Sequence, residues 1–145
     1  MSKLQPSVAL TLTQPWASLV VCGAKCLETR SWRTAHRGPL FIHAAKGFPR
    51  WARDLCTTEP FKTALRESAD IQSASELPLG ALLGTVMLLD CVPTASDDLD
   101  GIGDDERAFG DYGEGRWAWL LAEPRLLDRA VPMKGALSLW RVGEI

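Results

Sequence analysis

Residues 10–32 read LTLTQPWASLVVCGAKCLETRSW, and this stretch decides how the first part of the chain folds. Apolar residues alternate with small or polar ones at its start, which predicts a strand over residues 7–12. Proline has no N–H to lose in a first helical turn, so a helix is expected from about Pro15 to Cys22. Gly23 suits the left-handed position that ends a helix. The stretch therefore predicts a strand followed directly by a short helix.

A second strand is expected at residues 25–32, because the side-chain character alternates again after the helix. Alternate residues of a strand point to opposite faces, so Glu28, Arg30 and Trp32 share one face and Thr29 lies on the other. Glu28 and Arg30 carry opposite charges two residues apart, so we expect them to share one surface beside Trp32. This strand would gather charged and aromatic side chains on a single face.

The rest of the chain predicts more strands than helices. An apolar run at residues 81–92 is nearly continuous, which indicates a strand buried on both faces. Strands and helices do not alternate regularly, so we expect an α+β domain with a small curved sheet or barrel rather than a doubly wound parallel sheet. The further strands are expected at residues 39–45, 116–122, 126–131 and 137–142, and the further helices at residues 50–56 and 61–68.

The length and composition favour one domain, residues 1–145. Hydrophobic residues make up 46% of the chain and charged residues 23%, the balance of a chain that can bury a core. No apolar stretch reaches the roughly 20 residues that a bilayer span needs, and the first residues lack the pattern of a secretion signal. We therefore expect no membrane partner and a cytoplasmic location, or a nuclear one in a eukaryotic cell.

Neither a metal nor a cofactor is expected. The four cysteines, Cys22, Cys26, Cys56 and Cys91, form no CxxC pair, so we interpret them as buried free thiols rather than zinc ligands. The chain also lacks a GxGxxG motif, a GxxxxGK motif and a nucleophile elbow, which disfavours dinucleotide binding, P-loop chemistry and serine hydrolysis.

The net charge of -2 hides two regions of opposite sign. Residues 93–115 hold eight acidic residues against the single base Arg107, a net charge of -7. The remaining residues carry 15 Lys and Arg against 10 Asp and Glu, a net charge of +5. A basic body indicates a polyanionic partner such as nucleic acid, although a merely solvated surface would show the same charges.

The stretch at residues 10–32, followed by HRGPLFIHAAK at residues 36–46, is too particular to be explained by composition. It resembles the ASCH domain, a branch of the PUA-like superfamily, and the likeness runs from Leu10 to Arg141. The matching elements are Gln14-Pro15-Trp16-Ala17, Gly23, Lys25, Glu28, Arg30, Trp32, Arg37-Gly38, His43-Ala44, Gly80-Ala81-Leu82-Leu83-Gly84, Asp90-Cys91, Pro132-Met133-Lys134-Gly135 and Leu139-Trp140.

The resemblance implies a PUA-like small β-barrel flanked by helices, with a cleft that binds RNA or DNA. Some small members of the family hydrolyse the acetyl group of N4-acetylcytidine, and they resemble the pattern Lys-x-x-Thr-x-Arg. Here Lys25 and Arg30 match, but Glu28 stands where those members have the threonine nucleophile. Thr29 is adjacent but would point to the other face of the strand, so it does not simply replace the missing hydroxyl.

The candidate site centres on the matching charged residues. Lys25 and Arg30 can neutralise phosphates, tryptophans can stack on bases, and the amide of a glutamine can read a base edge. In the other interpretation Glu28 and Arg30 are only a structural pair and the tryptophans belong to the core, while His43 is either a satisfied buried imidazole or a general base. The full set of expected nucleic-acid contacts is Gln14, Trp16, Lys25, Glu28, Arg30, Trp32, Arg37, Lys46 and Lys134.

Three functions are compatible with these residues. The first is a module with a basic cleft that binds RNA or single-stranded DNA. The second is a hydrolase in the same cleft, acting on a modified nucleoside such as N4-acetylcytidine or as a nuclease, with Lys25 and Glu28 as catalytic residues. The third is a protein-interaction adaptor. The acidic stretch at residues 93–115 is either a lid that competes for the basic cleft or a solubilising insertion.

Overall fold

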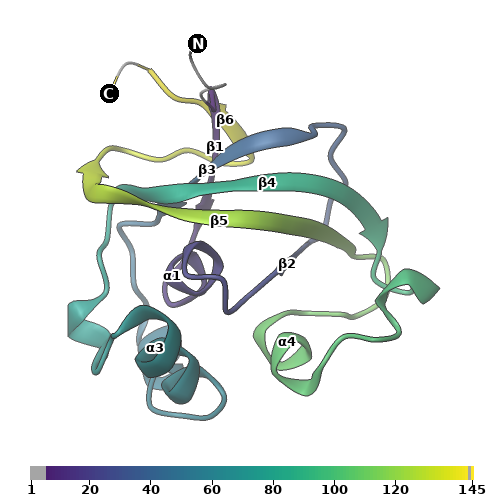
Figure 1. Ribbon diagram of the computed structural model, residues 1–145, viewed down its shortest axis with the longest axis horizontal. Coiled ribbons are helices and arrows are strands. Elements are labelled where there is room, and N and C mark those ends of the chain that lie inside the picture. Colours follow the sequence, from purple (N-terminus) through teal and green to yellow (C-terminus); the bar gives the residue numbers. More distant parts are fainter. Residues whose placement is uncertain (1–5, 144) are drawn as a thin grey trace.

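The structure, a computed structural model, describes residues 6–143 and 145 and is built on one mixed, curled sheet (Figure 1). Its strand order is β2-β5-β4-β3-β1-β6, with β1 and β3 parallel and all other neighbours antiparallel. The sheet forms a half-barrel that remains open between β2 and β6. The strands are β1 (Val8–Leu12), β2 (Leu27–Arg30), β3 (Gly38–Ala44), β4 (Ala81–Pro93), β5 (Trp117–Pro132) and β6 (Leu139–Arg141).

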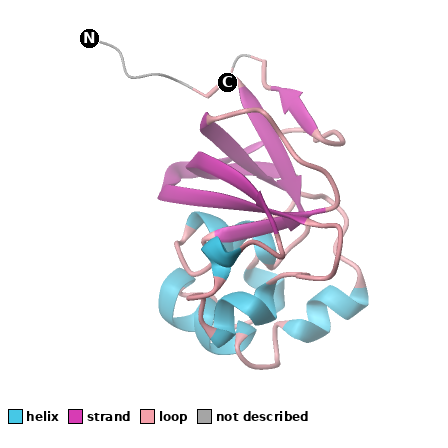
Figure 2. Ribbon diagram, turned by 90° about the vertical axis from the view of Figure 1, so that its right-hand side faces the viewer, coloured by secondary structure: helices cyan, strands magenta, loops and turns pink. Residues whose placement is uncertain are grey.

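The helices gather on one side of the sheet (Figure 2). The expected α+β class, with a barrel-like sheet and flanking helices, is therefore confirmed. Among the described residues, no helix has both the length and the apolar content needed to cross a membrane. The helices are α1 (Trp16–Val21), α2 (Arg50–Leu55), α3 (Phe61–Ala69) and α4 (Asp104–Phe109), with single 3-10 turns η1 (Ala74–Glu76) and η2 (Asp97–Leu99).

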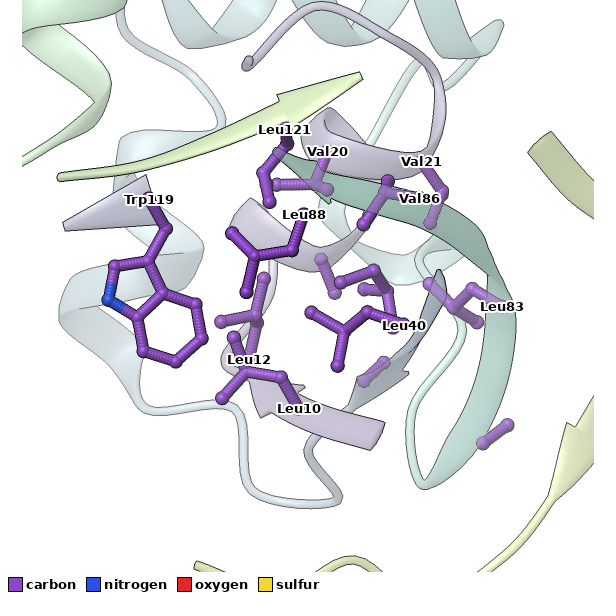
Figure 3. Packing of buried hydrophobic residues seen from close by; sticks show 14 of the residues in the cluster. Leu10, Leu12, Val20, Val21, Leu40, Leu83, Val86, Leu88, Trp119 and Leu121 are labelled. Carbon is purple, nitrogen blue, oxygen red and sulfur yellow. The ribbon is translucent and has the colours of Figure 1, made fainter. Parts of the chain in front are cut away.

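Helix α1 fills the inside of the curled sheet, as the residues around it show (Figure 3). Val20 and Val21 of α1 pack against Leu10, Leu88 and Trp119 from three strands, in a cluster of buried apolar side chains. Trp119 is completely buried, as expected for a core tryptophan. Burying large aliphatic and aromatic side chains stabilises each by about 1.5–3 kcal/mol relative to exposure, so this cluster fixes α1 and the residues on either side of it.

Strand β5 is longer than the sequence predicts. Two separate pieces were expected at residues 116–122 and 126–131, whereas the structure has one strand, Trp117–Pro132, paired with β4 along most of its length. The register shifts at several points, and Glu123 adopts a φ of 50° within the strand. Pro124 and Glu123 break the sequence pattern, but bulges absorb the irregularity and the hydrogen-bonded ladder continues.

The acidic segment, residues 93–115, is not a plain loop, and the sequence analysis missed its helix. It contains η2 and α4, and buries Leu99 and Phe109. The Ser96 hydroxyl accepts the Asp98 N–H at 3.1 Å at the start of η2. Three acidic residues occupy the first turn of α4, where they favour the positive end of the helix dipole. Acidic residues of this segment thus stabilise the N-terminus of α4. The segment as a whole folds back onto β2.

Candidate functional site

The acidic segment covers the outer edge of β2. The Glu106 carboxylate accepts the backbone N–H groups of Cys26, at 2.8 Å, and Leu27, at 3.4 Å. The N–H of Asp111 donates to the Thr29 hydroxyl at 2.9 Å, and the Arg116 guanidinium donates to the Thr29 carbonyl oxygen at 3.2 Å. The Glu106 and Arg116 side chains therefore bind backbone groups at this edge of the sheet, where no further strand of residues 6–143 pairs with β2.

Lys25, just before β2, and Glu28 and Arg30 within β2 form a charged triad. The Lys25 side chain is 1% exposed, its ammonium donates to the Leu27 carbonyl oxygen, and it lies 3.3 Å from one Glu28 carboxylate oxygen. The second Glu28 oxygen accepts from Arg30 at 3.1 Å. The Arg30 guanidinium lies over the Trp32 ring, 5.7 Å from its centroid. Both carboxylate oxygens of Glu28 are thus held by cations.

Beside the triad lies a cleft of about 460 Å³, here called the tryptophan cleft. Trp16 and Trp51 stand next to each other, with ring centroids 5.8 Å apart, and Trp51 is 62% exposed. The Trp16 indole N–H donates to the Phe109 carbonyl oxygen at 2.7 Å, which fixes the ring against α4. The lining residues are Trp16, Glu28, Thr29, Trp51, Leu55, Phe61, Ala108, Phe109, Gly110, Asp111 and Arg116.

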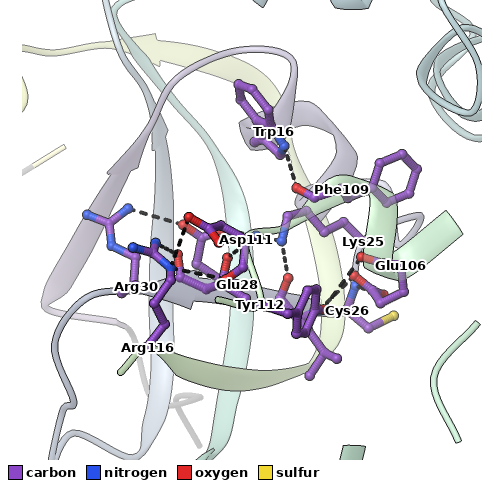
Figure 4. Close-up of polar contacts among 12 residues, drawn as sticks. Trp16, Lys25, Cys26, Glu28, Arg30, Glu106, Phe109, Asp111, Tyr112 and Arg116 are labelled. Carbon is purple, nitrogen blue, oxygen red and sulfur yellow. Dashed lines mark hydrogen bonds and ion pairs between the residues drawn. The ribbon is translucent and has the colours of Figure 1, made fainter. Parts of the chain in front are cut away.

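Cations meet at the β2 side of the tryptophan cleft, where Arg30 and Arg116 lie near Glu28 and Asp111 (Figure 4). The Arg116 guanidinium donates to the Asp111 backbone carbonyl oxygen at 3.0 Å and lies 3.5 Å from its carboxylate. About a quarter of each arginine side chain is exposed. The cleft is thus lined by aromatic side chains and by the Arg116 guanidinium, and Arg30 lies beside it on Glu28.

A sequence profile of the ASCH domain matches residues 10–128 of the chain. The chain belongs to the ASCH domain family. It is 31% identical, over 92% of its own length, to activating signal cointegrator 1 of Homo sapiens and of Mus musculus, and it spans 22% of the length of each. The fold also matches the crystal structure of ASCH from Zymomonas mobilis, with a TM-score of 0.55 and 14% identity over 94% of this chain and 87% of that one.

Three of the residues expected to contact nucleic acid are buried in this ASCH domain, namely Gln14, Lys25 and Glu28, although Glu28 still lines the tryptophan cleft. Gln14 is fully buried: its amide NH₂ donates to the Ser18 hydroxyl at 2.8 Å and the Pro78 carbonyl at 2.9 Å, and its oxygen accepts the Ser18 N–H. Its amide is therefore occupied and does not face a base. Lys25 is likewise enclosed, so its ammonium holds the motif together instead of facing solvent.

The remaining expected contacts separate into different places. Trp16, Glu28 and Arg30 lie at or beside the tryptophan cleft, and Trp32 packs edge-on against Trp119 at 4.8 Å. Arg37 is exposed but donates to the carbonyls of Thr34 and His36 and lies 3.4 Å from Asp90. Lys46 and Lys134 line another cavity. The nine expected residues therefore do not form one surface.

The sequence analysis did not name Trp51 and Arg116, although both line the tryptophan cleft. Trp51 lies between Arg50 and Ala52-Arg53 in the ASCH domain, and an aromatic residue flanked by arginines in a short helix is a signal of nucleic-acid contact. Arg116 is the first base after the acidic residues of the acidic segment. Its contact with Thr29 of β2 becomes visible only in the folded structure, because the acidic segment brings Arg116 back to that strand.

The single tyrosine of this ASCH domain, Tyr112, reports on the packing of the acidic segment. Burial, together with the nearby Glu106 carboxylate, raises the pKa of Tyr112 to about 12. We expect the ultraviolet absorbance of tyrosinate to appear near pH 12 in the folded protein and near the ordinary value of about 10 in urea. Folding stability should fall between these pH values, because the unfolded chain gives up this proton first.

Glu106→Gln provides the control, since it removes the carboxylate charge and keeps the shape of the side chain. The Tyr112 midpoint should move toward pH 10 in this variant. A folded wild-type protein that titrates near pH 10 would contradict the close packing of the acidic segment on β2.

Proposed function

We propose that this ASCH domain binds nucleic acid, RNA or single-stranded DNA, in the tryptophan cleft. ASCH domains are associated with RNA binding. The observation that carries the proposal is Trp51, a large aromatic side chain that is 62% exposed beside a cleft. Burying such a ring normally stabilises a protein, so its exposure at a concave surface indicates a ligand with an aromatic face.

The two tryptophans suit a stacked base. Trp16 is fixed by its hydrogen bond to Phe109 and by an edge-on contact with the Phe61 ring at 5.9 Å, and it packs against the Trp51 ring at a tilt of 46°. A supported ring loses little conformational freedom when a base stacks on it, and such stacking contributes about 1–3 kcal/mol per base with little sequence preference.

Arginines around the tryptophan cleft suit the phosphates of the same strand. Arg30 and Arg116 lie on the β2 side, and Arg50 and Arg53 flank Trp51 along α2. Guanidinium groups bind phosphate through paired hydrogen bonds, and neutralising phosphates releases counterions. We therefore expect affinity that falls as salt rises. Lys25 and Gln14 are not part of this proposed surface because neither side chain reaches the solvent.

Fluorescence anisotropy with labelled single-stranded RNA, single-stranded DNA and duplexes, at several salt concentrations, tests the proposal. Trp51→Ala should weaken single-strand binding by about 5–150-fold, the loss expected for one stacked base. Leu126→Ala is the matched control, since Leu126 is 65% exposed but lies outside the cleft, and it should bind like wild type. Equal affinities for Trp51→Ala and wild type would refute a stacking role for the cleft.

The arginines are tested separately in the same assay. Arg30→Gln should weaken binding and reduce its salt dependence, because one phosphate-neutralising charge is lost. Arg129→Gln on β5 changes the net charge by the same amount outside the cleft and should have little effect. If the two variants lose affinity equally, the attraction comes from overall charge and not from this cleft.

We assign the tryptophan cleft to binding rather than to hydrolysis of N4-acetylcytidine. Glu28 replaces the expected hydroxyl nucleophile, and its two carboxylate oxygens are engaged by Lys25 and Arg30. Thr29 lines the cleft together with Glu28, although the sequence analysis expected it to face away, and its hydroxyl already accepts the Asp111 N–H at 2.9 Å. Incubation of the protein with N4-acetylcytidine should release no acetate, and turnover abolished by Glu28→Gln would support the hydrolase instead.

A further inference from the structure

A second cavity, here called the lysine pocket, opens where β3 ends, β4 begins and the chain leaves β5. It has a volume of about 910 Å³ and shares no described lining residue with the tryptophan cleft. Cavities of this size are typical of small-ligand sites. The lining residues are Thr11, His43, Ala45, Lys46, Leu79, Gly80, Met133, Lys134, Gly135, Ala136 and Leu137.

A buried hydrogen-bond network forms the floor of the lysine pocket. His43 is 1% exposed, and its Nε2 lies 2.6 Å from the Met133 carbonyl oxygen, so this nitrogen carries a proton and donates. Its Nδ1 lies 3.1 Å from the Thr11 hydroxyl, which accepts the Trp140 indole N–H at 2.9 Å. These bonds join β1, β3, β6 and the segment after β5, so the floor is fixed before any ligand arrives.

Gly135 packs directly against Thr11 and His43 of this floor, and the space is too small for any side chain at position 135. A Cβ at this position would lie 2.6 Å from the Thr11 hydroxyl oxygen and 2.7 Å from His43 Cε1. Both distances are far below van der Waals contact, and the neighbours are held by hydrogen bonds. The backbone of residues 134–137 is thereby placed at the surface of the pocket.

The charge of the lysine pocket is positive. Lys46 and Lys134 are its charged lining residues. Among the described residues, no carboxylate lies within 4.0 Å of either ammonium group, so neither lysine forms an ion pair there. The backbone N–H groups of Lys134, Gly135, Ala136 and Leu137 donate to no group among residues 6–143. Ammonium groups and free N–H donors together favour an anion with several acceptor oxygens.

The remaining wall is apolar and open to solvent. Leu137 is 93% exposed, Leu79 is 40% exposed, and Met133 lies beside them. An inorganic anion would leave this apolar surface uncovered, whereas an anion attached to a planar or apolar group would bury it. We propose that the lysine pocket binds a phosphate monoester on a planar or apolar group, either a free nucleoside monophosphate or the phosphorylated 5′ end of a nucleic-acid strand.

NMR of the ¹⁵N-labelled protein, titrated with adenosine 5′-monophosphate, locates the site directly. The backbone signals of residues 134–137 and the indole N–H of Trp140 should shift, while the indole N–H of Trp51 stays in place. Trp51 reports instead on the tryptophan cleft, so a failure of that proposed site and a failure of the lysine pocket give different spectra. Shifts confined to the cleft, or no shifts, would overturn the lysine pocket as a site.

Affinities for a series of related ligands test the separate contributions of the phosphate and of the planar or apolar group attached to it. Adenosine should bind at least about tenfold more weakly than its 5′-monophosphate, because it lacks the charged acceptor. Inorganic phosphate should also bind more weakly, and equal affinity would overturn the role of the apolar wall. A 5′-phosphorylated dinucleotide that binds more tightly than the free monophosphate identifies a strand end, and the reverse order identifies a free nucleotide. If neither binds, the proposal fails.

Substitutions then connect binding to the named groups. The double variant Lys46→Gln, Lys134→Gln should lose at least about tenfold in affinity for the monophosphate. Lys62→Gln on α3 removes a lysine that does not line the pocket, and it should bind like wild type. Gly135→Ala should abolish binding by displacing the floor, but the lysine variants leave the floor intact and decide the test if this variant fails to fold. Unchanged affinity in the double variant would overturn the proposal.

Discussion

Glu28→Ala is expected to destabilise the protein by about 3–5 kcal/mol, because it leaves the Lys25 ammonium buried without its carboxylate. The Lys25 side chain is 1% exposed and that of Glu28 is 9% exposed, so water does not replace the lost partner. The remaining contact of the ammonium, the Leu27 carbonyl oxygen, is neutral. Urea denaturation of wild type and variant, with stability taken from the midpoint and slope, measures the difference.

Two further variants separate the buried charge from the general cost of removing a glutamate. Glu67→Ala breaks the ion pair of Glu67 with Arg66, whose side chains are 66% and 48% exposed, and should cost less than about 1 kcal/mol. The double variant Lys25→Met, Glu28→Ala should be more stable than Glu28→Ala alone, because it removes the orphaned charge. A Glu28→Ala variant as stable as Glu67→Ala would show that the triad contributes nothing to folding.

Gly84→Ala should destabilise the protein by about 3 kcal/mol through a clash of backbone with backbone. A methyl group at position 84 would overlap the Arg125 carbonyl oxygen and lie 3.1 Å from a Val21 methyl group in the core. The β4–β5 register shifts next to this glycine, so the two strands come close where side chains are excluded. Overpacking of this kind costs about 1–3 kcal/mol, and a carbonyl in a ladder moves less readily than a side chain.

Gly47→Ala is the matched control for this substitution. No heavy atom outside its chain neighbours lies within 4 Å of a Cβ built at Gly47, and the residue is exposed. The free energy of unfolding of the Gly47→Ala variant should stay within about 0.5 kcal/mol of the wild-type value, as for ordinary surface substitutions. Equal thermal denaturation midpoints for the two variants would contradict the close approach of β4 and β5.

Most strands and helices of the fold could be predicted from local patterns, because their apolar spacing matches what the core requires. The helix expected at about residues 15–22 is α1, and the run at residues 81–92 is β4, buried on both faces at its start. The continuity of β5 could not be predicted, since bulges keep its pairing intact across Pro124. Helix α4 was missed because its acidic residues resemble those of a solvated loop.

The candidate site was predicted less completely than the fold. The family resemblance identified Glu28, Arg30 and Trp16, which lie at or beside the tryptophan cleft. It did not indicate that Lys25 is buried, because a motif gives charges and not their exposure. Trp51 was missed for the opposite reason, since local sequence patterns do not reveal that an aromatic residue of a short helix stays outside the core.

The side chains that cover β2 also have a consequence for solubility. An edge strand with unpaired N–H and C=O groups is a template onto which another molecule can add a strand. Glu106 binds the N–H groups of Cys26 and Leu27, at the start of β2. Lys25 and Arg116 bind the carbonyl oxygens of Leu27 and Thr29. Charged side chains thus take the places that a neighbouring strand would use, and the opposite edge, β6, is only three residues long. Glu106 of the acidic segment, with Lys25 and Arg116, thus disfavours the pairing of β2 with a strand from another copy of the molecule.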